Sequence, residues 1–231
     1  MSIFREHFKK WPRFYYFFAV VFGPLLLRGL SPKRFLCEYT VRGTIINLGS
    51  GPKIIAPGVT NMDIAQYPGV DIIGDASDMP LASATVDAII SDTVFEHLRT
   101  PGKAIQEVYR VLKPNGLVYI TVPFIYPFHS SPSDFTRWTK LGLIELLSGF
   151  EILEIGVRAG PFSSLTVIIC YLVATIFSVG NDTLYWFLLD ISMILFFPVK
   201  LLDFIFSYWP KSIDMAAVVY CVAKKPPVAK K

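Results

Sequence analysis

The sequence predicts an α/β fold built on a doubly wound, mostly parallel sheet. Short apolar runs alternate with helical patterns through residues 43–160, as they do in such folds. Most of these runs end at Gly, Asp or Asn, which are common in turns. The length of 231 residues fits one domain with attached segments, because domains usually span about 100–200 residues.

Seven apolar segments are predicted to be strands of this sheet. In chain order they are residues 43–48, 59–63, 70–74, 86–91, 117–122, 150–157 and 213–223. A helix is predicted over 101–112, where apolar residues recur every three or four positions until the helix breakers from Lys113 to Gly116. A second, short helix is predicted over 139–147, with Thr139 as its N-cap.

The composition is more apolar than that of a simple soluble enzyme. Hydrophobic residues make up 53% of the chain and charged residues 17%, against about 25% charged in an average protein. This apolar composition excludes a disordered chain, a coiled coil and a disulfide-stapled miniprotein. Cys37, Cys170 and Cys221 are far apart, with no His/Cys cluster, so we expect a reducing compartment and no metal. No signal-peptide cleavage site follows the first apolar run.

Charge is segregated along the chain. Residues 1–42 carry a net charge of +6, residues 43–160 of −4, residues 161–223 of −2 and the last eight residues of +4. Basic ends favour an anionic surface such as a phospholipid membrane, although solvated termini would have the same composition. Since no basic patch with interleaved aromatic residues accompanies the predicted site, a nucleic-acid partner is not expected.

The first concentration of apolar residues runs from Phe14 to Leu27, within an N-terminal segment that we assign to residues 1–42. As a helix it would be about 21 Å long, too short for a hydrocarbon core of about 30 Å. Basic residues flank it on both sides, which argues against crossing. We therefore expect it to lie on the cytoplasmic side of a membrane or, alternatively, to pack on the domain's own sheet.

The second concentration lies in residues 159–199, within an insertion that we assign to 161–212. Residues 159–181 carry no charge, Asn181 to Thr183 are predicted to form a turn, and 184–199 are apolar except for Asp190. We predict a hairpin of two apolar helices that either enters a membrane shallowly or crosses it twice. The last core strand, 213–223, and a basic tail, 224–231, follow this insertion.

Ligands of a doubly wound sheet bind at the carboxyl ends of its strands, so the residues that follow each strand are candidates for a site. Gly49, Ser50 and Gly51 follow the first strand, and the two glycines allow a ligand to approach the backbone. Their spacing is not the GxGxxG of dinucleotide folds. The carboxylate of Asp63 can accept two hydrogen bonds from a ribose diol, and Asp75 can accept one from an exocyclic amine.

Several segments resemble motifs of the class I S-adenosylmethionine-dependent methyltransferases, particularly the type 11-like members. The matching segments are 46–51, 74–81, 86–90 with 95–98, and 107–116. The resemblance implies a Rossmann-like methyltransferase domain over residues 43–160, an antiparallel last strand and S-adenosyl-L-methionine as the cofactor.

The resemblance also implies roles for the candidate cofactor-binding residues. Gly49 and Gly51 would lie along the methionine part of the cofactor, and Asp63 would hold the ribose hydroxyls. The adenine would lie beside Asp75 and Ala76, and the methionine end beside Asp92 and Thr93.

The chain departs from the family pattern at three points. Asn47 stands where an acidic residue is common, and Lys53 where a glycine is usual. The interval from Gly51 to Asp63 is too short for a full crossover helix. One sheet face must therefore be covered by the N-terminal segment, the hairpin or a membrane. These departures also leave open a non-catalytic binding or scaffold protein on this fold.

Residues 123–138, after the fifth predicted strand, are expected to contact the methyl acceptor. His129 has a pKa range suited to a general base, Asp134 can orient it, and Arg137 can bind a phosphate or carboxylate. Alternatively, Asp134 and Arg137 form a structural ion pair and His129 packs within the loop. His97 is expected to be structural. The segment weakly resembles one in methyltransferases of cell-envelope glycans, so the predicted acceptor is a small molecule, glycan or lipid-linked compound near a membrane.

Overall fold

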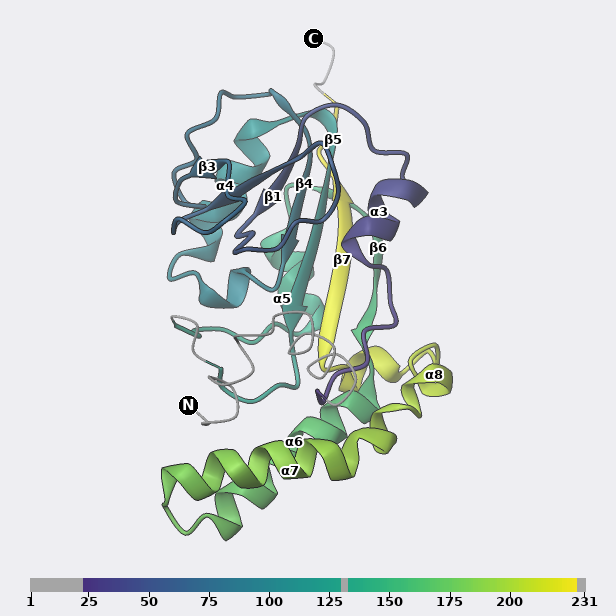
Figure 1. Cartoon of the computed structure of the whole chain (residues 1–231). Helices are drawn as coiled ribbons and strands as arrows, with labels where there is room; N and C mark the ends of the chain where they lie inside the picture. The colour runs from purple at the N-terminus through teal and green to yellow at the C-terminus, as the bar shows by residue number, and fades with distance from the viewer. Residues whose placement is uncertain (1–22, 130–132, 228–231) are drawn as a thin grey trace. The chain divides into compact units, whose positions relative to one another are not determined.

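The computed structural model describes residues 23–129 and 133–227, which cluster into two compact units (Figure 1). Of the described residues, the larger unit contains 30–124, 128–129, 133–158 and 219–227. The smaller unit contains residues 23–29, 125–127 and 159–218. Residues 14–22 of the predicted N-terminal apolar segment lie outside the described residues.

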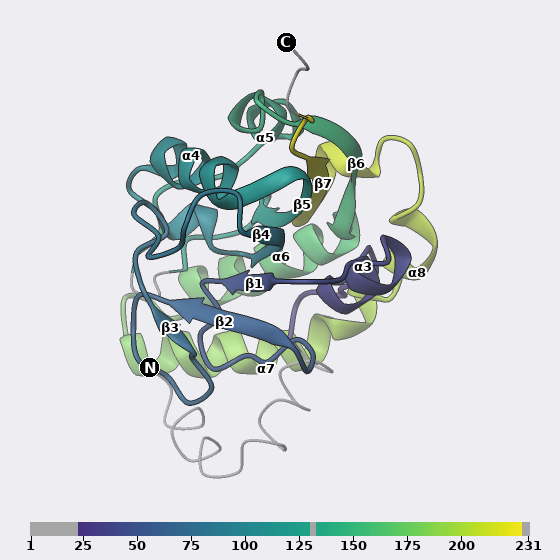
Figure 2. The same cartoon turned by 90° about the horizontal axis from the view of Figure 1, so that it is seen from above.

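A seven-stranded sheet of order β3-β2-β1-β4-β5-β7-β6 runs through the larger unit (Figure 2). Its strands are β1 (Ile45–Leu48), β2 (Val59–Asp63), β3 (Ile72–Ile73), β4 (Val86–Asp92), β5 (Leu112–Pro123), β6 (Glu151–Ala159) and β7 (Val218–Lys224). Strand β1 pairs in parallel with β2 and β4, β2 with β3, and β4 with β5. The predicted doubly wound sheet is therefore confirmed.

Strand β7 runs antiparallel to β5. The backbone N–H of Asn115 donates to the carbonyl of Lys225, and the N–H of Lys225 donates to the carbonyl of Gly116, each at 2.9 Å. These bonds join the beginning of β5 to the end of β7, so the two strands run in opposite directions. An antiparallel last strand was implied by the family resemblance.

Three predicted strands are shorter than expected, and the first of them, β1, begins at Ile45 instead of residue 43. Strand β3 keeps only two of the five residues expected, because it is an edge strand that pairs with β2 alone. The last strand begins at Val218 instead of residue 213, since Ser212–Met215 form the short 3-10 helix η2. The segment from Lys113 to Gly116 ends the preceding helix as predicted, and the structure assigns it to β5.

Two helices cover one face of the sheet (Figure 2). Helix α4 (Pro101–Val111) buries the apolar positions that predicted it: Ala104, Ile105, Val108 and Val111. Helix α5 (Lys140–Leu146) begins after Thr139, whose hydroxyl accepts a hydrogen bond of 3.0 Å from the N–H of Gly142. The predicted N-cap is therefore present.

The opposite face is covered by helix α3 (Pro32–Glu38), which the sequence analysis did not predict. No helix occurs in residues 49–58, as the short interval from Gly51 to Asp63 predicted, and none occurs in 64–71. Phe35 of α3 is fully buried and stacks on Tyr119 of β5 with ring centroids 5.3 Å apart. The same cluster contains Leu30, Ile45, Val59, Ala88, Ile90, Tyr220 and Val222. In the larger unit, this face of the sheet is therefore covered by the last part of the 1–42 segment, which follows Phe14–Leu27.

The smaller unit contains the predicted helical hairpin, formed by α6 (Pro161–Phe177) and α7 (Asp182–Lys200) (Figure 1). Cys170, Ala174 and Leu189 are buried where the two helices pack. The predicted turn at 181–183 is displaced, because the side chain of Asn181 caps α7 by accepting from the N–H of Leu184 at 2.9 Å. Asp182 and Thr183 therefore belong to α7.

Buried charges fix the ends of this hairpin. Asp203 in the short helix α8 (Asp203–Phe206) is fully buried and accepts the backbone N–H groups of Phe162 and Ser163 at 3.0 and 2.8 Å. It thereby caps the N-terminus of α6, where an anion is favoured. The ammonium of Lys200 donates to the carbonyl of Gly23, so the end of α7 is joined to the non-helical segment 23–27, part of the stretch expected to be helical.

Candidate functional site

The loop after β1 turns sharply at the carboxyl edge of the parallel strands. Gly49 and Gly51 have φ angles of +67° and +51°, which favour glycine. The N–H groups of Gly49 and Ser50 donate to the carbonyl of Met62 at 2.8 and 3.1 Å. A Cβ atom on Gly49 would lie 2.5 Å from a methyl carbon of Val94, whereas one on Gly51 would meet no atom within 4 Å. The backbone is therefore open to a ligand at Gly51.

The carboxylate of Asp63 organises this edge. Its Oδ2 accepts the N–H of Gly51 at 2.8 Å, and its Oδ1 accepts the N–H of Ala65 at 2.9 Å. A carboxylate has about four acceptor positions, so two remain for a vicinal diol. Asp63 thus lies where the sequence placed it, beside the glycine loop, and its contact with a ribose stays a prediction.

Asn47, which replaces the family's acidic residue, supports the loop from beneath. Its amide donates to the carbonyl of Lys53 at 3.1 Å and to Oδ1 of Asn61 at 2.9 Å. It is 3% exposed, so it is a structural part of the loop and presents no charge to a ligand. The first departure from the family pattern therefore has a role in the fold.

The end of β4 carries a paired acid. Burial alone would raise the pKa of Asp92, but the ammonium of Lys53, the hydroxyl of Thr121 and the charge of Arg158 together outweigh it, and the pKa is lowered. Oδ1 of Asp92 accepts the hydroxyl of Thr121 at 2.7 Å, and Thr121 also accepts the N–H of Thr93 at 2.9 Å. Thr93 has a φ of +59°, which is uncommon for a residue with a side chain. The position of Asp92 and Thr93 at the methionine end of the cofactor stays a prediction.

The loop after β3 is shaped by its own polar groups. Oδ1 of Asp75 accepts the N–H and the hydroxyl of Ser77 at 2.7 and 2.8 Å, and Ala76 is buried. Asp75 is exposed, so its other oxygen can accept from a ligand. The predicted adenine contacts of Asp75 and Ala76 therefore stay open. Glu107 and Arg110 of α4 fix the following residues: Glu107 accepts the N–H of Met79 at 2.8 Å, and Arg110 donates to its carbonyl at 3.1 Å.

A buried carboxylate that the sequence analysis missed lies next to these loops. Glu96, in the short 3-10 helix η1 (Phe95–His97), is 0% exposed. Neither of its carboxylate oxygens has a hydrogen-bond partner among the described residues. Burial raises the pKa of Glu96 to about 8. Its position directly after β4, beside a histidine, is the signal that could have identified it.

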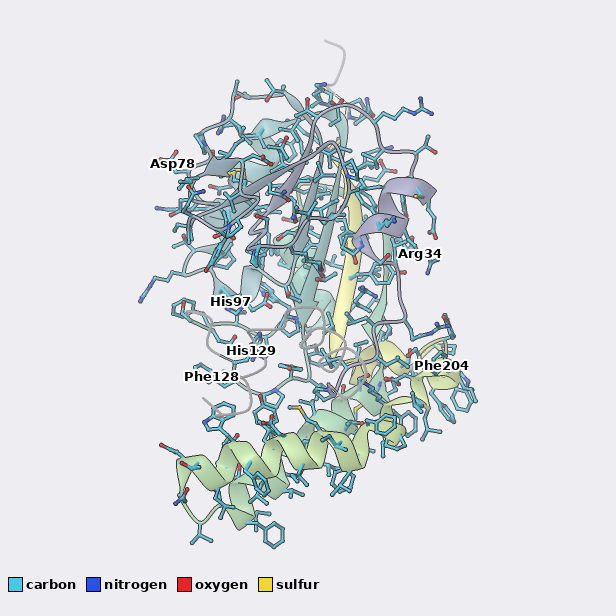
Figure 3. All side chains as sticks on the ribbon, viewed as in Figure 1. Arg34, Asp78, His97, Phe128, His129 and Phe204 are labelled. Atoms are coloured by element: carbon cyan, nitrogen blue, oxygen red, sulfur yellow. The ribbon has the colours of Figure 1, made fainter. Side chains whose placement is uncertain are left out.

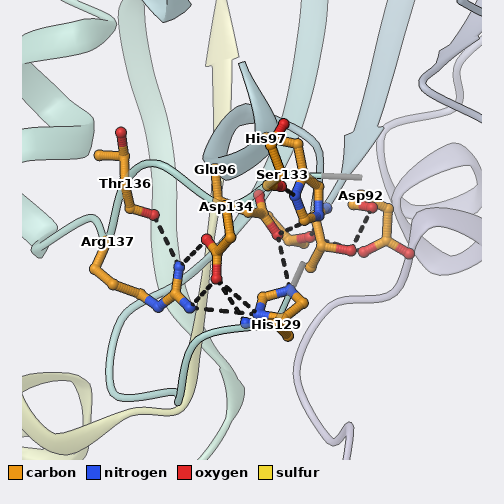
Figure 4. Close-up of polar contacts among 10 residues, drawn as sticks. Asp92, Glu96, His97, His129, Ser133, Asp134, Thr136 and Arg137 are labelled. Carbon is orange, nitrogen blue, oxygen red and sulfur yellow. Dashed lines mark hydrogen bonds and ion pairs between the residues drawn. The ribbon is translucent and has the colours of Figure 1, made fainter. Parts of the chain in front are cut away.

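The three predicted catalytic residues lie together in the segment after β5 (Figure 4). Arg137 forms a two-pronged ion pair with Asp134, in which Nη2 lies 2.5 Å from Oδ2. Oδ2 of Asp134 also accepts the N–H of His129 at 2.8 Å and lies 3.3 Å from Nδ1 of that ring. The hydrogen bond from Arg137 is the largest cause that lowers the pKa of Asp134 to about 2. This geometry fits both alternatives, in which Asp134 orients His129 or forms a structural ion pair with Arg137.

His97, which was expected to be structural, joins His129 and Glu96 (Figures 3 and 4). The His97 and His129 rings meet edge to face, with centroids 5.3 Å apart. Nε2 of His97 and Nε2 of His129 lie 3.8 and 4.0 Å from Oε1 of Glu96. Nδ1 of His97 is bonded to the carbonyl of Ser133. The structure thus adds two residues to the candidate site.

Comparisons with known proteins agree with this architecture. Residues 55–120 match the family described as "Methyltransferase domain". A "Probable S-adenosylmethionine-dependent methyltransferase" from Mycolicibacterium smegmatis is 32% identical over 100 residues, which cover 38% of this chain and 38% of that protein. A protein with the same description from Mycobacterium tuberculosis is 29% identical over 110 residues, which cover 42% of this chain and 39% of the relative.

Among solved structures, phosphoethanolamine N-methyltransferase 2 from Haemonchus contortus, in complex with S-adenosyl-L-methionine, gives a TM-score of 0.53. Its sequence identity is 16%, and the match covers 91% of this chain and 56% of that chain. At this identity the likeness shows the fold alone. The chain spans about two fifths of the length of the two mycobacterial relatives.

Proposed function

We propose that this chain, which carries a class I S-adenosylmethionine-dependent methyltransferase domain, transfers a methyl group to a small-molecule, glycan or lipid-linked acceptor at a membrane surface. The observation that carries the proposal is the hydrogen bond between Gly51 and Asp63. It brings the open glycine backbone and the carboxylate that we propose binds the ribose diol to the same edge of the parallel strands, where ligands of such sheets bind.

The cofactor supplies an activated methyl group on a sulfonium, so the protein's own residues have to position two reactants and manage one proton. The loop from Gly49 to Gly51 lies along the methionine part, and its backbone is open at Gly51. Asp63 accepts from the ribose hydroxyls while its bonds to Gly51 and Ala65 hold it still. Asp75 and Ala76 flank the adenine, and Asp92 with Thr93 borders the methionine end.

The acceptor binds on the segment from His129 to Arg137. Arg137 attracts an anionic group on the acceptor, because the Asp134 carboxylate holds its guanidinium in place. His129 is the residue of this segment suited to take a proton from the acceptor near neutral pH. Asp134 orients the His129 ring from the Nδ1 side.

Cofactor binding is tested by calorimetry with S-adenosylhomocysteine on the purified full chain. We expect one site per chain, weakened by the Asp63→Ala substitution. Absence of binding at millimolar ligand, in a preparation shown to be folded by circular dichroism, would overturn the proposal. Activity is then measured by transfer of labelled methyl groups to extracted small molecules, glycans and lipids.

The hairpin supports a membrane location. Of the described helices, α7 alone is long and apolar enough to cross a membrane, with a mean hydropathy of 1.5 and 11% of its most apolar stretch buried. Helix α6 is apolar and has 17 residues. The two helices are about 26 and 28 Å long, close to the roughly 30 Å of a hydrocarbon core. Many large apolar side chains on them are exposed, among them Leu172, Ile176, Phe177, Phe187 and Leu195.

We place the hairpin in the cytoplasmic leaflet, with the basic N-terminal segment and tail attracted to anionic headgroups. A hairpin returns its two ends to the same side, so the methyltransferase domain stays on that side whether the helices insert shallowly or cross. Flotation with phosphatidylglycerol vesicles tests this location. A chain that stays soluble without detergent and does not float would overturn it.

A non-catalytic binding protein is the second candidate function, and Asn47 favours it. Its amide is used within the loop, so the cofactor's ammonium group loses the usual acidic partner. Binding of S-adenosylhomocysteine without methyl transfer to any of the three extracts would support this role over catalysis.

A further inference from the structure

We infer that Glu96, His97 and His129 form a binding site for one divalent transition-metal ion such as Zn²⁺. The three residues come from two segments that meet beyond the ends of β4 and β5, and each offers one ligand atom. These atoms all lie within 4.8 Å of one another. The sequence predicted no metal because more than thirty residues separate His97 from His129, which leaves no recognisable ligand spacing.

The two histidines turn their Nε2 atoms toward the carboxylate. Nε2 of His97 lies 3.8 Å and Nε2 of His129 lies 4.0 Å from Oε1 of Glu96. Zinc bonds of about 2.0–2.1 Å place ligand atoms about 3.3 Å apart in a tetrahedron. Side-chain movements of less than about 1 Å would therefore close the site around an ion.

The hydrogen bonds of His97 leave its Nε2 available to a metal. Its Nδ1 contacts the carbonyl oxygen of Ser133, which can only accept a hydrogen bond. The proton of the neutral ring is therefore on Nδ1, and the lone pair of Nε2 faces Glu96. Fixing a ligand histidine through its second nitrogen is a usual feature of metal sites.

The second ring nitrogen of His129, Nδ1, faces a carboxylate, as Nδ1 of His97 faces a carbonyl. Its Nδ1 lies 3.3 Å from Oδ2 of Asp134 and also 3.3 Å from Nη2 of Arg137. The guanidinium nitrogen already donates to Asp134 at 2.5 Å, so we assign the Nδ1 proton to the contact with Asp134. The order carboxylate, histidine, metal recurs in zinc sites, where the carboxylate fixes the tautomer.

The burial of Glu96 is an independent observation that points to a cation. Its carboxylate is 0% exposed and has no hydrogen-bond donor among the described residues. A buried polar group without a partner is costly and therefore rare in native structures. An ion bound by Oε1 and the two imidazoles would satisfy this carboxylate.

The ligand set selects the class of ion. Two imidazole nitrogens with one carboxylate suit Zn²⁺, Co²⁺, Mn²⁺ or Fe²⁺, whereas Mg²⁺ and Ca²⁺ prefer all-oxygen sites. Three protein ligands leave at least one position open, as in catalytic zinc sites. Resting on the proposed function, we assign that position to an acceptor oxygen, whose pKa the ion would lower. His129 would then act as a ligand instead of a base, because its Nε2 has one lone pair, and the proton of the acceptor oxygen would pass to solvent water.

Cobalt binding to the full chain tests the site without any turnover. Protein stripped with a chelator is titrated with Co²⁺, and the visible absorption of histidine-bound cobalt is followed, then displaced by Zn²⁺. We expect one ion per chain. Glu96→Gln, His97→Ala and His129→Ala should each weaken binding at least tenfold. His7→Ala is the matched control, because His7 is the third histidine of the chain, and it should bind as the unchanged protein does.

Folding is verified by circular dichroism, and Glu96→Gln should stay folded because it replaces a buried carboxyl group with an uncharged amide of nearly the same volume. If it does not fold, His97→Gln takes its place as the diagnostic variant. The proposal is overturned if the folded, unchanged chain gives no cobalt spectrum with metal in excess, or if the diagnostic variant binds as tightly. S-adenosylhomocysteine binding, measured on the same preparation, shows separately whether the proposed methyltransferase function holds.

Discussion

The backbone N–H of Gly51 donates a 2.8 Å hydrogen bond to Oδ2 of Asp63, which joins the loop after β1 to the end of β2. The other oxygen of the same carboxylate accepts the N–H of Ala65 at 2.9 Å. One side chain thus fixes the loops on both sides of the proposed ribose position. Because this bond takes the place of a crossover helix in ordering the loop, cofactor binding should depend strongly on it.

Replacing Asp63 with alanine should weaken S-adenosylhomocysteine binding by about 10–100-fold, which corresponds to the roughly 1.5–3 kcal/mol of a hydrogen bond to a charged group. Isothermal titration calorimetry on the full chain measures the change. Glu145→Gln is the control, because Glu145 is an exposed acid on α5. Equal affinity of the Asp63→Ala variant and the control would show that the ribose is held elsewhere.

The two glycines of this loop should respond differently to alanine. Both adopt positive φ angles, which cost a residue with a side chain about 1–2 kcal/mol. At Gly49 the new methyl would also meet Val94 at 2.5 Å, so Gly49→Ala should lower the free energy of unfolding by more than Gly51→Ala does. At Gly51 the methyl would enter open space, so its main effect should be weaker binding of S-adenosylhomocysteine.

Urea unfolding and calorimetry on both variants separate the two effects. If Gly51→Ala keeps full affinity, the open space at Gly51 does not hold the cofactor. If Gly49→Ala is no less stable than Gly51→Ala, Val94 has room to move and the close approach does not matter.

The sequence predicted the sheet because its information is local. Strand β4 is a short, mostly apolar run closed by aspartate, and α4 shows its buried stripe in the spacing of its apolar residues. Helix α3 was missed because it has seven residues and only Pro32 and Phe35 are buried, too few to make a periodic pattern. Its stability comes from contacts with distant residues such as Tyr119.

The candidate site likewise contains residues that the sequence predicted and residues that it did not. The glycine loop and Asp63 follow strands, so their positions could be predicted from the chain alone. Glu96 and His97 gain their significance from His129, more than thirty residues away, and only the tertiary structure shows that their side chains converge. The burial of Glu96 is likewise a property of the packed structure, because nothing in its neighbours along the sequence predicts an unpartnered carboxylate.

The loop after β3 should lose stability at acid pH through Glu107. Its carboxylate accepts from Arg110 at 2.6 Å and from the N–H of Met79 at 2.8 Å, and the hydrogen bond from Arg110 is the main cause of its lowered pKa. A carboxyl whose pKa is lowered by folding stabilises the native state above its unfolded pKa, and this stabilisation is lost as the pH falls. Unfolding free energies measured by urea between about pH 6 and pH 3 should therefore fall more steeply for the unchanged chain than for Glu107→Gln.

Arg110→Ala provides the complementary test. It removes the donor to the carbonyls of Met79 and Leu81, so the loop should exchange its amide hydrogens faster at neutral pH. Lys103→Ala is the control, since Lys103 is an exposed cation on the same helix. Identical pH profiles for Glu107→Gln and the unchanged chain would mean that this ion pair contributes no measurable stability, as many exposed pairs do not.

The hairpin should bind membranes through its exposed apolar side chains. Ile176 of α6 is 64% exposed, and Leu141 of α5, in the other unit, is 74% exposed. If α6 enters the hydrocarbon region, Ile176→Asp places a carboxylate there at a cost of up to about 2.5–3.5 kcal/mol, which lowers vesicle partitioning by up to about 70–400-fold. Leu141→Asp changes the same kind of exposed residue outside the hairpin and should partition as the unchanged chain does.

Flotation with phosphatidylglycerol vesicles measures both variants. Equal losses would indicate that general surface charge governs binding. Loss by Ile176→Asp alone would locate the contact on α6, and no loss by either would exclude insertion of this helix.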